Sequence, residues 1–312
     1  MKAATQIVFV TGKGGVGKTT AAAALARWTA GHGRRTLLLE TAPDGPVAAL
    51  FGRPPLGHEP TRLAPGIDGL RVAARQLVED YFRGVLRFSF LANALLSSST
   101  FNALTAAAPG ISEFLLLDRI LGIVEPGLGR RAKYDLLVVD GPATGHALRL
   151  LRTPRTLLSM VPAGPLSGTS QRLRRLLEDE RRTAVVPVSL AEEMSVRETI
   201  EMYRVLRDDL GLHVARPVVN RVFPRRFGRA DAAAIEAHHG AGAEALVAAA
   251  GFAIARRREA ERHVAHLRRA LGTTPVLFRQ LFTPELHADD LAPLGRTIGR
   301  ALFAEPQRGG RP

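Results

Sequence analysis

The segment Gln6-Ile-Val-Phe-Val-Thr-Gly-Lys-Gly-Gly-Val-Gly-Lys-Thr-Thr20 decides the fold of this 312-residue chain. Its apolar, β-branched first part, which ends at Thr11, is typical of a fully buried parallel strand. The alanine-rich stretch from Gly17 to His32 favours a helix. Between them, Gly12 to Thr19 fits the pattern G-x-x-x-x-G-K-[ST], which requires a strand before it and a helix after it. The sequence therefore predicts a phosphate-binding loop.

Each residue type in this loop has a chemical reason. Glycines allow backbone N–H groups to point at an anion, and the N-terminus of the helix adds a partial positive charge. Lys18 can reach the β- and γ-phosphates, and the hydroxyl of Thr19 can ligate Mg²⁺. We therefore expect ATP and Mg²⁺ as cofactors. The loop residues expected to bind them are Gly12, Gly14, Gly15, Val16, Gly17, Lys18, Thr19 and Thr20.

Six more strand-like runs alternate with helical stretches along the chain. Such alternation predicts an α/β fold with a doubly wound, mostly parallel sheet of about seven or eight strands. The expected strands are Arg35–Glu40, Gly69–Ala74, Tyr134–Asp140, Thr183–Ser189, Val214–Asn220 and Thr274–Phe278.

We expect residues 1–304 to form one domain, because no repeat or linker interrupts them, and 305–312 to be a flexible polar tail. Residues from about 76 to 127 have no strand pattern and carry apolar residues at helical spacing, which predicts a helical insertion. Those residues either pack on the core or form a groove for a client or partner. From Arg225 to Leu271 the composition predicts two helices that break near Gly251.

The composition limits the possible functions. A net charge of +14 suits nucleic acid or anionic membranes, but a coding bias towards arginine explains it equally well. No window approaches the ~18 apolar residues of a membrane-spanning helix, and no cleavage signal is recognisable near Met1, so we expect a cytoplasmic protein. The absence of cysteine excludes disulfides, iron–sulfur clusters and thiolate zinc sites.

A carboxylate ends the buried run Tyr134-Asp-Leu-Leu-Val-Val-Asp140. Open α/β sheets place their ligand chemistry at the C-terminal ends of the strands, where the phosphate-binding loop also lies. We expect Asp140 to hold Mg²⁺ through water, together with Thr19. The sequence thus predicts a metal site between two separate motifs.

These motifs together resemble one family. The loop Gly12–Thr20, with Lys13 directly after its first glycine, is similar to the deviant phosphate loop of the SIMIBI class of switch ATPases. The segment Gly141–Leu151 resembles the switch II signature of the ArsA-type ATPases, which serve arsenite pumps or the targeting of tail-anchored proteins. Shorter matches extend the resemblance over most of the chain. They lie at Pro109–Glu113, Glu192–Thr199, Val218–Val222, Thr274–Phe278 and Thr283–Glu285.

The resemblance implies a P-loop NTPase fold and a role for each matching residue. Lys13 would cross a dimer interface to the partner's nucleotide, somewhat like an arginine finger. Gly145 would sense the γ-phosphate through its backbone amide, Asn220 would hydrogen-bond the adenine, and Glu192 would contact the nucleotide. We expect His146, next to Gly145, to be a buried, hydrogen-bonded structural residue in preference to a catalytic base.

Two departures from the family bear on catalysis and ligands. The switch I aspartate, which orients the attacking water in the family, is replaced by Ala42, and Asp44 is the nearest substitute. A displaced carboxylate need not reach the water, so the sequence does not decide whether the protein hydrolyses ATP. The family's metalloid-binding and zinc-binding cysteines are missing, so we expect neither zinc nor metalloid. The catalytic candidates are Lys13, Lys18, Asp140 and Asp44.

Three functions remain. The first is a dimeric ArsA-type ATPase, paired with itself or with a related subunit, that couples ATP hydrolysis to a hydrophobic client or a membrane-associated partner. The second is a non-hydrolysing, nucleotide-gated scaffold paired with an active homologue. The third is a partition or positioning ATPase that binds DNA through its basic surface. The switch II match and Asn220 favour the first over the third, so nucleic acid is not the favoured partner.

Overall fold

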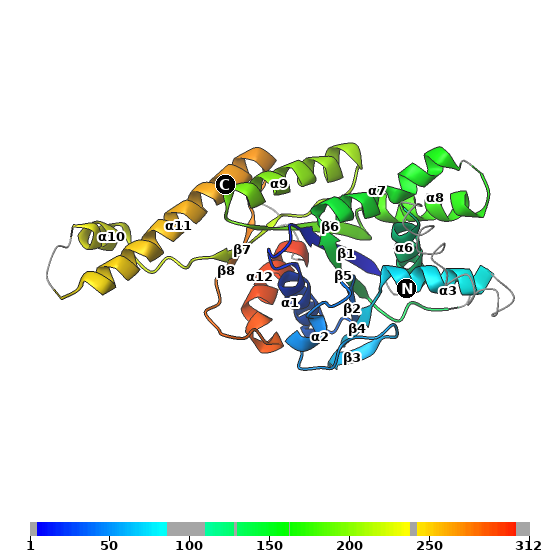
Figure 1. Cartoon of the computed structure of the whole chain (residues 1–312), viewed down its shortest axis with the longest axis horizontal. Coiled ribbons are helices and arrows are strands. Elements are labelled where there is room, and N and C mark those ends of the chain that lie inside the picture. The colour runs from blue at the N-terminus through cyan, green and yellow to red at the C-terminus, as the bar shows by residue number, and fades with distance from the viewer. Residues whose placement is uncertain (1–4, 86–109, 128–129, 162, 238–241, 304–312) are drawn as a thin grey trace, which may run out of the picture.

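The first apolar run forms β1 (Gln6–Gly12), an interior strand of an eight-stranded sheet in the computed structural model (Figure 1). β1 pairs in parallel with β5 on one side and with β6 on the other. The strand order is β3-β4-β2-β5-β1-β6-β7-β8, and β3 alone runs antiparallel to its neighbour. The structure describes residues 5–85, 110–127, 130–161, 163–237 and 242–303. Within them, the doubly wound, mostly parallel sheet is confirmed.

The other described elements have the following bounds. The strands are β2 (Thr36–Glu40), β3 (Thr61–Ala64), β4 (Ile67–Arg71), β5 (Leu136–Ala143), β6 (Thr183–Leu190), β7 (Val218–Val222) and β8 (Val276–Arg279). The helices are α1 (Lys18–Gly31), α2 (Val47–Leu50), α3 (Ala74–Val85), α6 (Ile111–Val124), α7 (Thr144–Met160), α8 (Pro165–Glu178), α9 (Glu193–Arg204), η1 (Val205–Asp209), α10 (Arg229–Glu236), α11 (Glu244–Leu271), η2 (Ala288–Leu291) and α12 (Ala292–Phe303).

Helices cover both faces of the sheet because successive strand residues point to opposite sides. Ile7 and Phe9 of β1 lie in a buried cluster with residues of α6, α7, α8, α9 and α11. Val8 and Val10 lie in the cluster on the other face, which the alanines of α1 and the apolar residues of α12 complete. The continuous apolar runs of the sequence are thus explained by burial from two sides.

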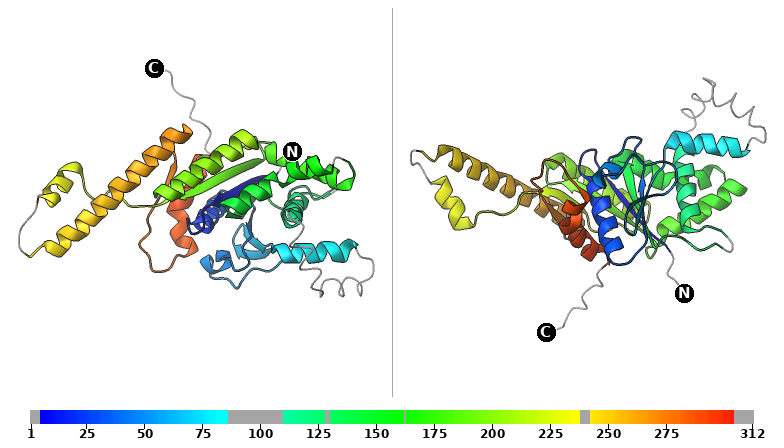
Figure 2. Two further views of the ribbon diagram at one scale, coloured as in Figure 1. Left: turned by 45° about the horizontal axis from the view of Figure 1, so that its top comes forward. Right: turned by 90° about the horizontal axis from the view of Figure 1, so that it is seen from below.

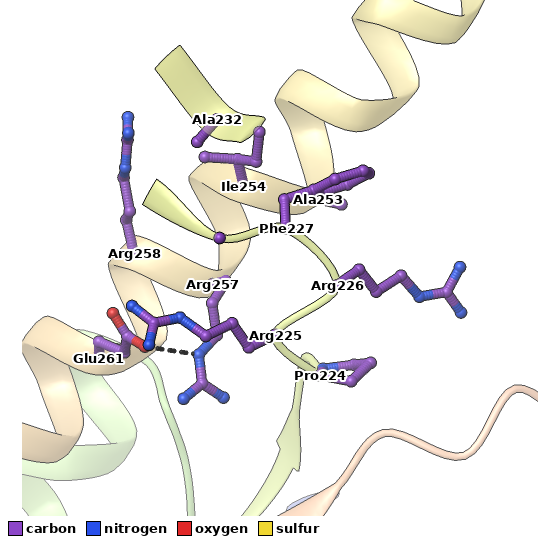
Figure 3. Close-up of a pocket in the computed structure, with 11 residues that line it drawn as sticks. Pro224, Arg225, Arg226, Phe227, Ala232, Ala253, Ile254, Arg257, Arg258 and Glu261 are labelled. Carbon is purple, nitrogen blue, oxygen red and sulfur yellow. Dashed lines mark hydrogen bonds and ion pairs between the residues drawn. The ribbon is translucent and has the colours of Figure 1, made fainter. Parts of the chain in front are cut away.

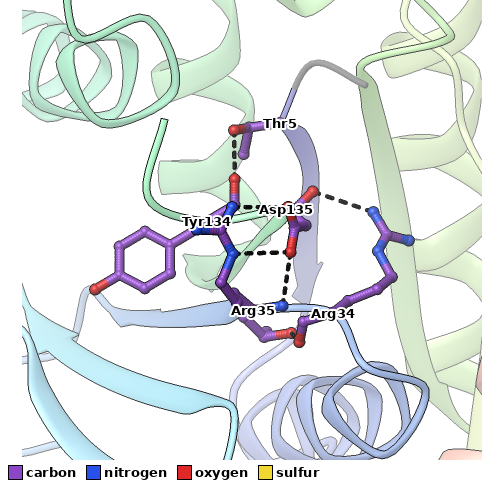
Figure 4. A network of polar contacts seen from close by, with 6 residues as sticks. Thr5, Arg34, Arg35, Tyr134 and Asp135 are labelled. Carbon is purple, nitrogen blue, oxygen red and sulfur yellow. Dashed lines mark hydrogen bonds and ion pairs between the residues drawn. The ribbon is translucent and has the colours of Figure 1, made fainter. Parts of the chain in front are cut away.

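Polar contacts join three strand beginnings at the edge opposite the phosphate-binding loop (Figure 4). Arg35 makes two side-chain hydrogen bonds to the carboxylate of Asp135, of 3.1 and 2.9 Å. Arg34 donates to the backbone oxygen of Asp135 at 3.1 Å, and Thr5 donates to that of Tyr134 at 2.7 Å. These contacts hold β1, β2 and β5 in register from their N-terminal ends.

Three details differ from the sequence expectations. β3 was not expected, because this antiparallel edge strand has only four residues and the first two are exposed. The strand expected at 214–220 begins only at Val218, and Val214 makes an isolated bridge to Val185. Gly251 does not break a helix: it lies inside the continuous α11, and the two helices are already separate because α10 ends at Glu236 and α11 begins at Glu244.

Within the expected insertion at 76–127, residues 76–85 belong to helix α3 and residues 111–124 form helix α6. Leu77 of α3 and Phe114 of α6 pack against a small cluster of Val78 and Leu115, so some of the apolar positions hold the two helices together. Residues 86–109 lie outside the described part, as does the expected tail at 305–312. The assignment of 1–304 to one domain stays a prediction.

Two further observations concern the helices. α10 and α11 form a hairpin that projects away from the sheet (Figure 2). Among the described residues, no helix is long and apolar enough to cross a membrane.

Candidate functional site

The predicted phosphate-binding loop connects β1 to α1, so its backbone lies at the N-terminus of a fourteen-residue helix. Gly12, Gly15 and Gly17 have φ angles of 151, 78 and 93°, which residues other than glycine rarely adopt. A Cβ on Gly12 would lie 2.1 Å from the carbonyl oxygen of Val188 on β6. The loop therefore has the open, glycine-dependent backbone that an anion-binding nest requires.

Thr19 and Asp140 meet as the sequence predicted. The Thr19 hydroxyl donates to Oδ2 of Asp140 at 2.6 Å, across 121 residues of chain. Asp140 is 5% exposed, and its Oδ1 is buried without a hydrogen-bond partner. Burial raises the pKa of Asp140 to about 6; the Thr19 hydrogen bond and the Lys18 charge act against this rise, and the charge of Glu40 adds to it. A hydroxyl beside an unsatisfied carboxylate oxygen fits a hard, oxygen-liganded cation such as Mg²⁺.

The two loop lysines lie near Glu198, an acid that the sequence did not single out. Lys18 Nζ donates to the backbone oxygen of Lys13 at 3.2 Å, and burial lowers the Lys18 pKa against the charges of Asp140 and Glu198. Lys13 Nζ lies 3.8 Å from Oε2 of Glu198 on α9, with 45% of the Lys13 side chain exposed. The segment Glu192–Thr199 therefore reaches the loop through Glu198. Glu192 itself precedes α9, and the residue is exposed.

The switch II segment spans the last residues of β5 and the first turns of α7. Gly145 is exposed in the first turn of the helix, where its backbone N–H has no intrahelical acceptor. The hydroxyl of the preceding Thr144 is buried without a hydrogen-bond partner, a feature that the sequence did not reveal. His146 is exposed and its Nδ1 contacts Arg149, so the expectation of a buried histidine was wrong. The helix register turns His146 to the surface while Thr144 points inward.

Switch I presents a different carboxylate from the one expected. Asp44 is exposed in a turn and makes no hydrogen bond or ion pair with other described residues. Glu40, the last residue of β2, is 1% exposed and pairs in the sheet register with Asp140. Its Oε1 accepts a hydrogen bond from Val47 N at 2.8 Å. Burial raises the Glu40 pKa, although this hydrogen bond and the charge of Arg71 oppose the rise.

Asn220 is the third of the five residues of β7, and its side chain braces the phosphate-binding loop. Its Nδ2 donates to the carbonyl oxygen of Val16 at 2.9 Å, and its Oδ1 accepts from the N–H of Arg221. A carboxamide nitrogen carries two hydrogens, so one donor remains for a base. A pocket of about 250 Å³ opens beside it, with Thr20 and Thr283 among the lining residues. The expected contact of Asn220 with adenine stays a prediction. The pocket beside Asn220 is the expected place for the base.

The sequence of this chain is similar to those of several known ATPases. Residues 5–163 match the model of a family described as anion-transporting ATPases. The ATPase BagA of Mycobacterium tuberculosis is 30% identical over 231 residues, which cover 72% of this chain and 67% of that protein. An arsenical pump-driving ATPase of Acidiphilium multivorum is 26% identical over 73% of this chain and 41% of its own length. An ATPase ASNA1 homolog of Paramecium tetraurelia is 33% identical over 48% of this chain and 44% of its own.

Proposed function

Because this chain belongs to the ArsA-type family of anion-transporting ATPases, we propose that it binds Mg·ATP between the phosphate-binding loop and Asp140 and hydrolyses it. The observation that carries the proposal is the 2.6 Å contact between Thr19 and Asp140, which leaves a buried carboxylate oxygen without a partner. A cation bound there would satisfy that oxygen. Neither motif alone supplies both ligands.

Each group of residues in the site has a separate role in the proposed reaction. The loop amides from Gly14 to Thr19 would bind the phosphate oxygens, and the ammonium group of Lys18 would neutralise charge on the β- and γ-phosphates. Mg²⁺, when bound, withdraws charge from the phosphate oxygens. The amide of Gly145 at the start of α7 is an additional donor for the γ-phosphate. Thr144 has a buried hydroxyl next to it, which can hydrogen-bond a water or phosphate oxygen.

The proposal includes a dimer, either of this chain with itself or with a related subunit. Lys13 must leave Glu198 if it is to reach a partner's nucleotide, and a 3.8 Å contact between half-exposed side chains is weak enough to exchange. Closing around the γ-phosphate would order both switches and move α7, which packs against α6 of the insertion. Nucleotide state would thereby be coupled to a client or partner of the insertion.

A nucleotide-gated scaffold is the second candidate function. It is supported by Ala42, which stands where the family has the switch I aspartate. Ala42 has no carboxylate to orient water, and Asp44 is exposed. Glu40 is the buried acid nearest in sequence, but its carboxylate accepts the hydrogen bond from Val47 at the start of α2. Hydrolysis therefore depends on whether Glu40 or a partner's residue can position the water.

Single-turnover hydrolysis of bound ATP separates the two candidates. We expect the wild-type protein with Mg²⁺ to release phosphate faster than Lys18→Ala, which keeps the loop backbone but lacks the ammonium group. A wild-type rate equal to that of Lys18→Ala, with ATP binding intact, would establish the scaffold. Failure of the folded wild-type protein to bind Mg·ATP in calorimetry would refute both.

A further inference from the structure

Half of the chain's net charge lies in one segment. Residues 216–279 contain twelve arginines, no lysine and five acidic residues, a net charge of +7 out of +14. This segment includes the α10–α11 hairpin, which leaves the sheet from the C-terminal end of β7 (Figures 1 and 2). A uniform coding bias would spread arginine along the whole chain, so this local excess of positive charge needs its own explanation.

Three phenylalanines meet at the base of the hairpin. The Phe223 ring lies edge-to-face with Phe252 and with Phe282, at centroid distances of 6.2 and 5.8 Å. Phe252 is 60% exposed and Phe282 is 61% exposed. Guanidinium groups lie over two of the rings: Arg226 over Phe282 at 5.2 Å and Arg256 over Phe223 at 5.9 Å. We call these five residues the aromatic–arginine surface.

A pocket of about 390 Å³ continues this surface between the loop after β7 and α11 (Figure 3). In the figure, Arg226 and Arg258 extend outward on different sides of the pocket. Arg257 is fixed by Glu261 at 2.8 Å and by the backbone oxygen of Phe223 at 2.9 Å. Four arginines and one glutamate among the lining residues make the pocket strongly cationic. The surface thus alternates cationic groups with apolar rings.

We propose that the aromatic–arginine surface binds single-stranded nucleic acid. Guanidinium groups bind backbone phosphates, and exposed rings stack on unpaired bases, a combination that suits single strands and not duplexes. An anionic membrane would use the same arginines. It fits less well, because Glu236 and Glu244 flank the outer end of the hairpin, where a membrane-inserting tip would need apolar residues.

The surface is connected to the predicted base pocket from two sides. Phe223 follows Asn220 by three residues, and Phe282 lies between Leu281 and Thr283, which both line that pocket. A base in the pocket would contact the two loops that carry these rings. The binding test is therefore made without ATP, so that its result does not depend on the proposed ATPase activity.

Fluorescence anisotropy with a labelled oligothymidylate tests the proposal. We expect binding by the wild-type protein, weaker binding of a duplex of equal length, and affinity that falls with salt. Arg226→Ala combined with Arg256→Ala removes both guanidinium groups of the surface, so the slope of log affinity against log salt should fall by about 1.4. Arg174→Ala with Arg175→Ala, two exposed arginines on α8, is the matched charge control and should leave the slope unchanged.

Phe252 separates stacking from general apolar contact. Phe252→Leu should weaken oligothymidylate binding about fivefold or more, whereas Phe252→Tyr should restore it, because only an aromatic ring stacks on a base. Circular dichroism establishes that each variant is folded. The proposal is wrong if the oligonucleotide does not bind, if Leu and Tyr variants bind equally, or if the α8 control loses as much affinity as the hairpin variant. Binding to vesicles with phosphatidylglycerol, without binding to the oligonucleotide, would also overturn it.

Discussion

Replacing Asp140 by asparagine should stabilise the nucleotide-free protein while removing a ligand of the proposed magnesium site. The pKa of Asp140 is raised from 3.8 to about 6, chiefly by burial. A carboxyl group with a raised pKa in the folded state binds its proton more tightly there than in the unfolded chain. The protonated Asp140 therefore contributes most to the free energy of unfolding at low pH. This contribution is lost as the pH rises from about 4 through about 6.

The size of the effect follows from the same values. One pKa unit corresponds to about 1.4 kcal/mol, so the charged Asp140 costs the folded state about 3 kcal/mol at neutral pH. An asparagine resembles the protonated acid and can still accept the hydrogen bond from Thr19. We therefore expect Asp140→Asn to be more stable than the wild-type protein by about 2–3 kcal/mol near pH 7.5, and about equally stable near pH 4.

Urea unfolding in the presence of a chelator, at both pH values, measures this difference. Asp68→Asn is the matched control. Burial opposes the charge of Asp68, but hydrogen bonds from Tyr134 and Lys133, with the charge of Arg62, outweigh burial and lower its pKa. Asp68→Asn should therefore destabilise the protein near pH 7.5. If Asp140→Asn is no more stable than the wild-type protein there, the proposed cost of the buried charge is refuted.

Three further predictions concern the same site. Gly17→Ala should abolish ATP binding, measured by calorimetry, because its Cβ would lie 2.1 Å from Asn220 Nδ2 in a backbone with φ of 93°; retained binding would contradict this. Asn220→Ala should weaken ATP binding about tenfold by removing the brace on Val16, and an unchanged preference for ATP over GTP would refute its role at the base. Glu40→Gln should slow single-turnover hydrolysis more than Asp44→Asn does, because Glu40 is the buried acid beside Asp140; the reverse order would restore Asp44 as the candidate.

The sequence predicted the parts of the site that are defined by local patterns. Gly12 to Thr19 must form a nest because the glycines permit its backbone, and Asp140 must lie near it because β1 and β5 are neighbouring parallel strands in which Val10 pairs with Asp140. The meeting of Thr19 and Asp140 could therefore be expected from two short segments.

The missed residues depend on contacts between distant segments. Glu40 looked like an ordinary strand end, and its burial arises because α2 folds back over it and Val47 donates to it. In the sequence, Glu198 is one of several acids in a charged helix. Only the position of α9 beside the loop brings its carboxylate near Lys13. Thr144 and His146 are two residues apart, and the helix register alone decided which is buried.

Helix propensity also misled at Gly251. A glycine inside a helix costs about 1 kcal/mol relative to alanine, which the surrounding alanines and the packing of Leu267 farther along α11 offset. The short antiparallel strand at Thr61–Ala64 had no apolar alternation to reveal it.

The brace between Asn220 and Val16 has a consequence for dissecting this protein. The phosphate-binding loop, the switches and Asp140 all lie within the family-matched residues 5–163. A fragment cut there would nevertheless lose β6 and leave one side of β1 as a bare edge, prone to pair with other chains. It would also lose the carboxamide that holds Val16. The smallest working unit therefore extends at least to β7, well past the last residue of any phosphate-binding motif.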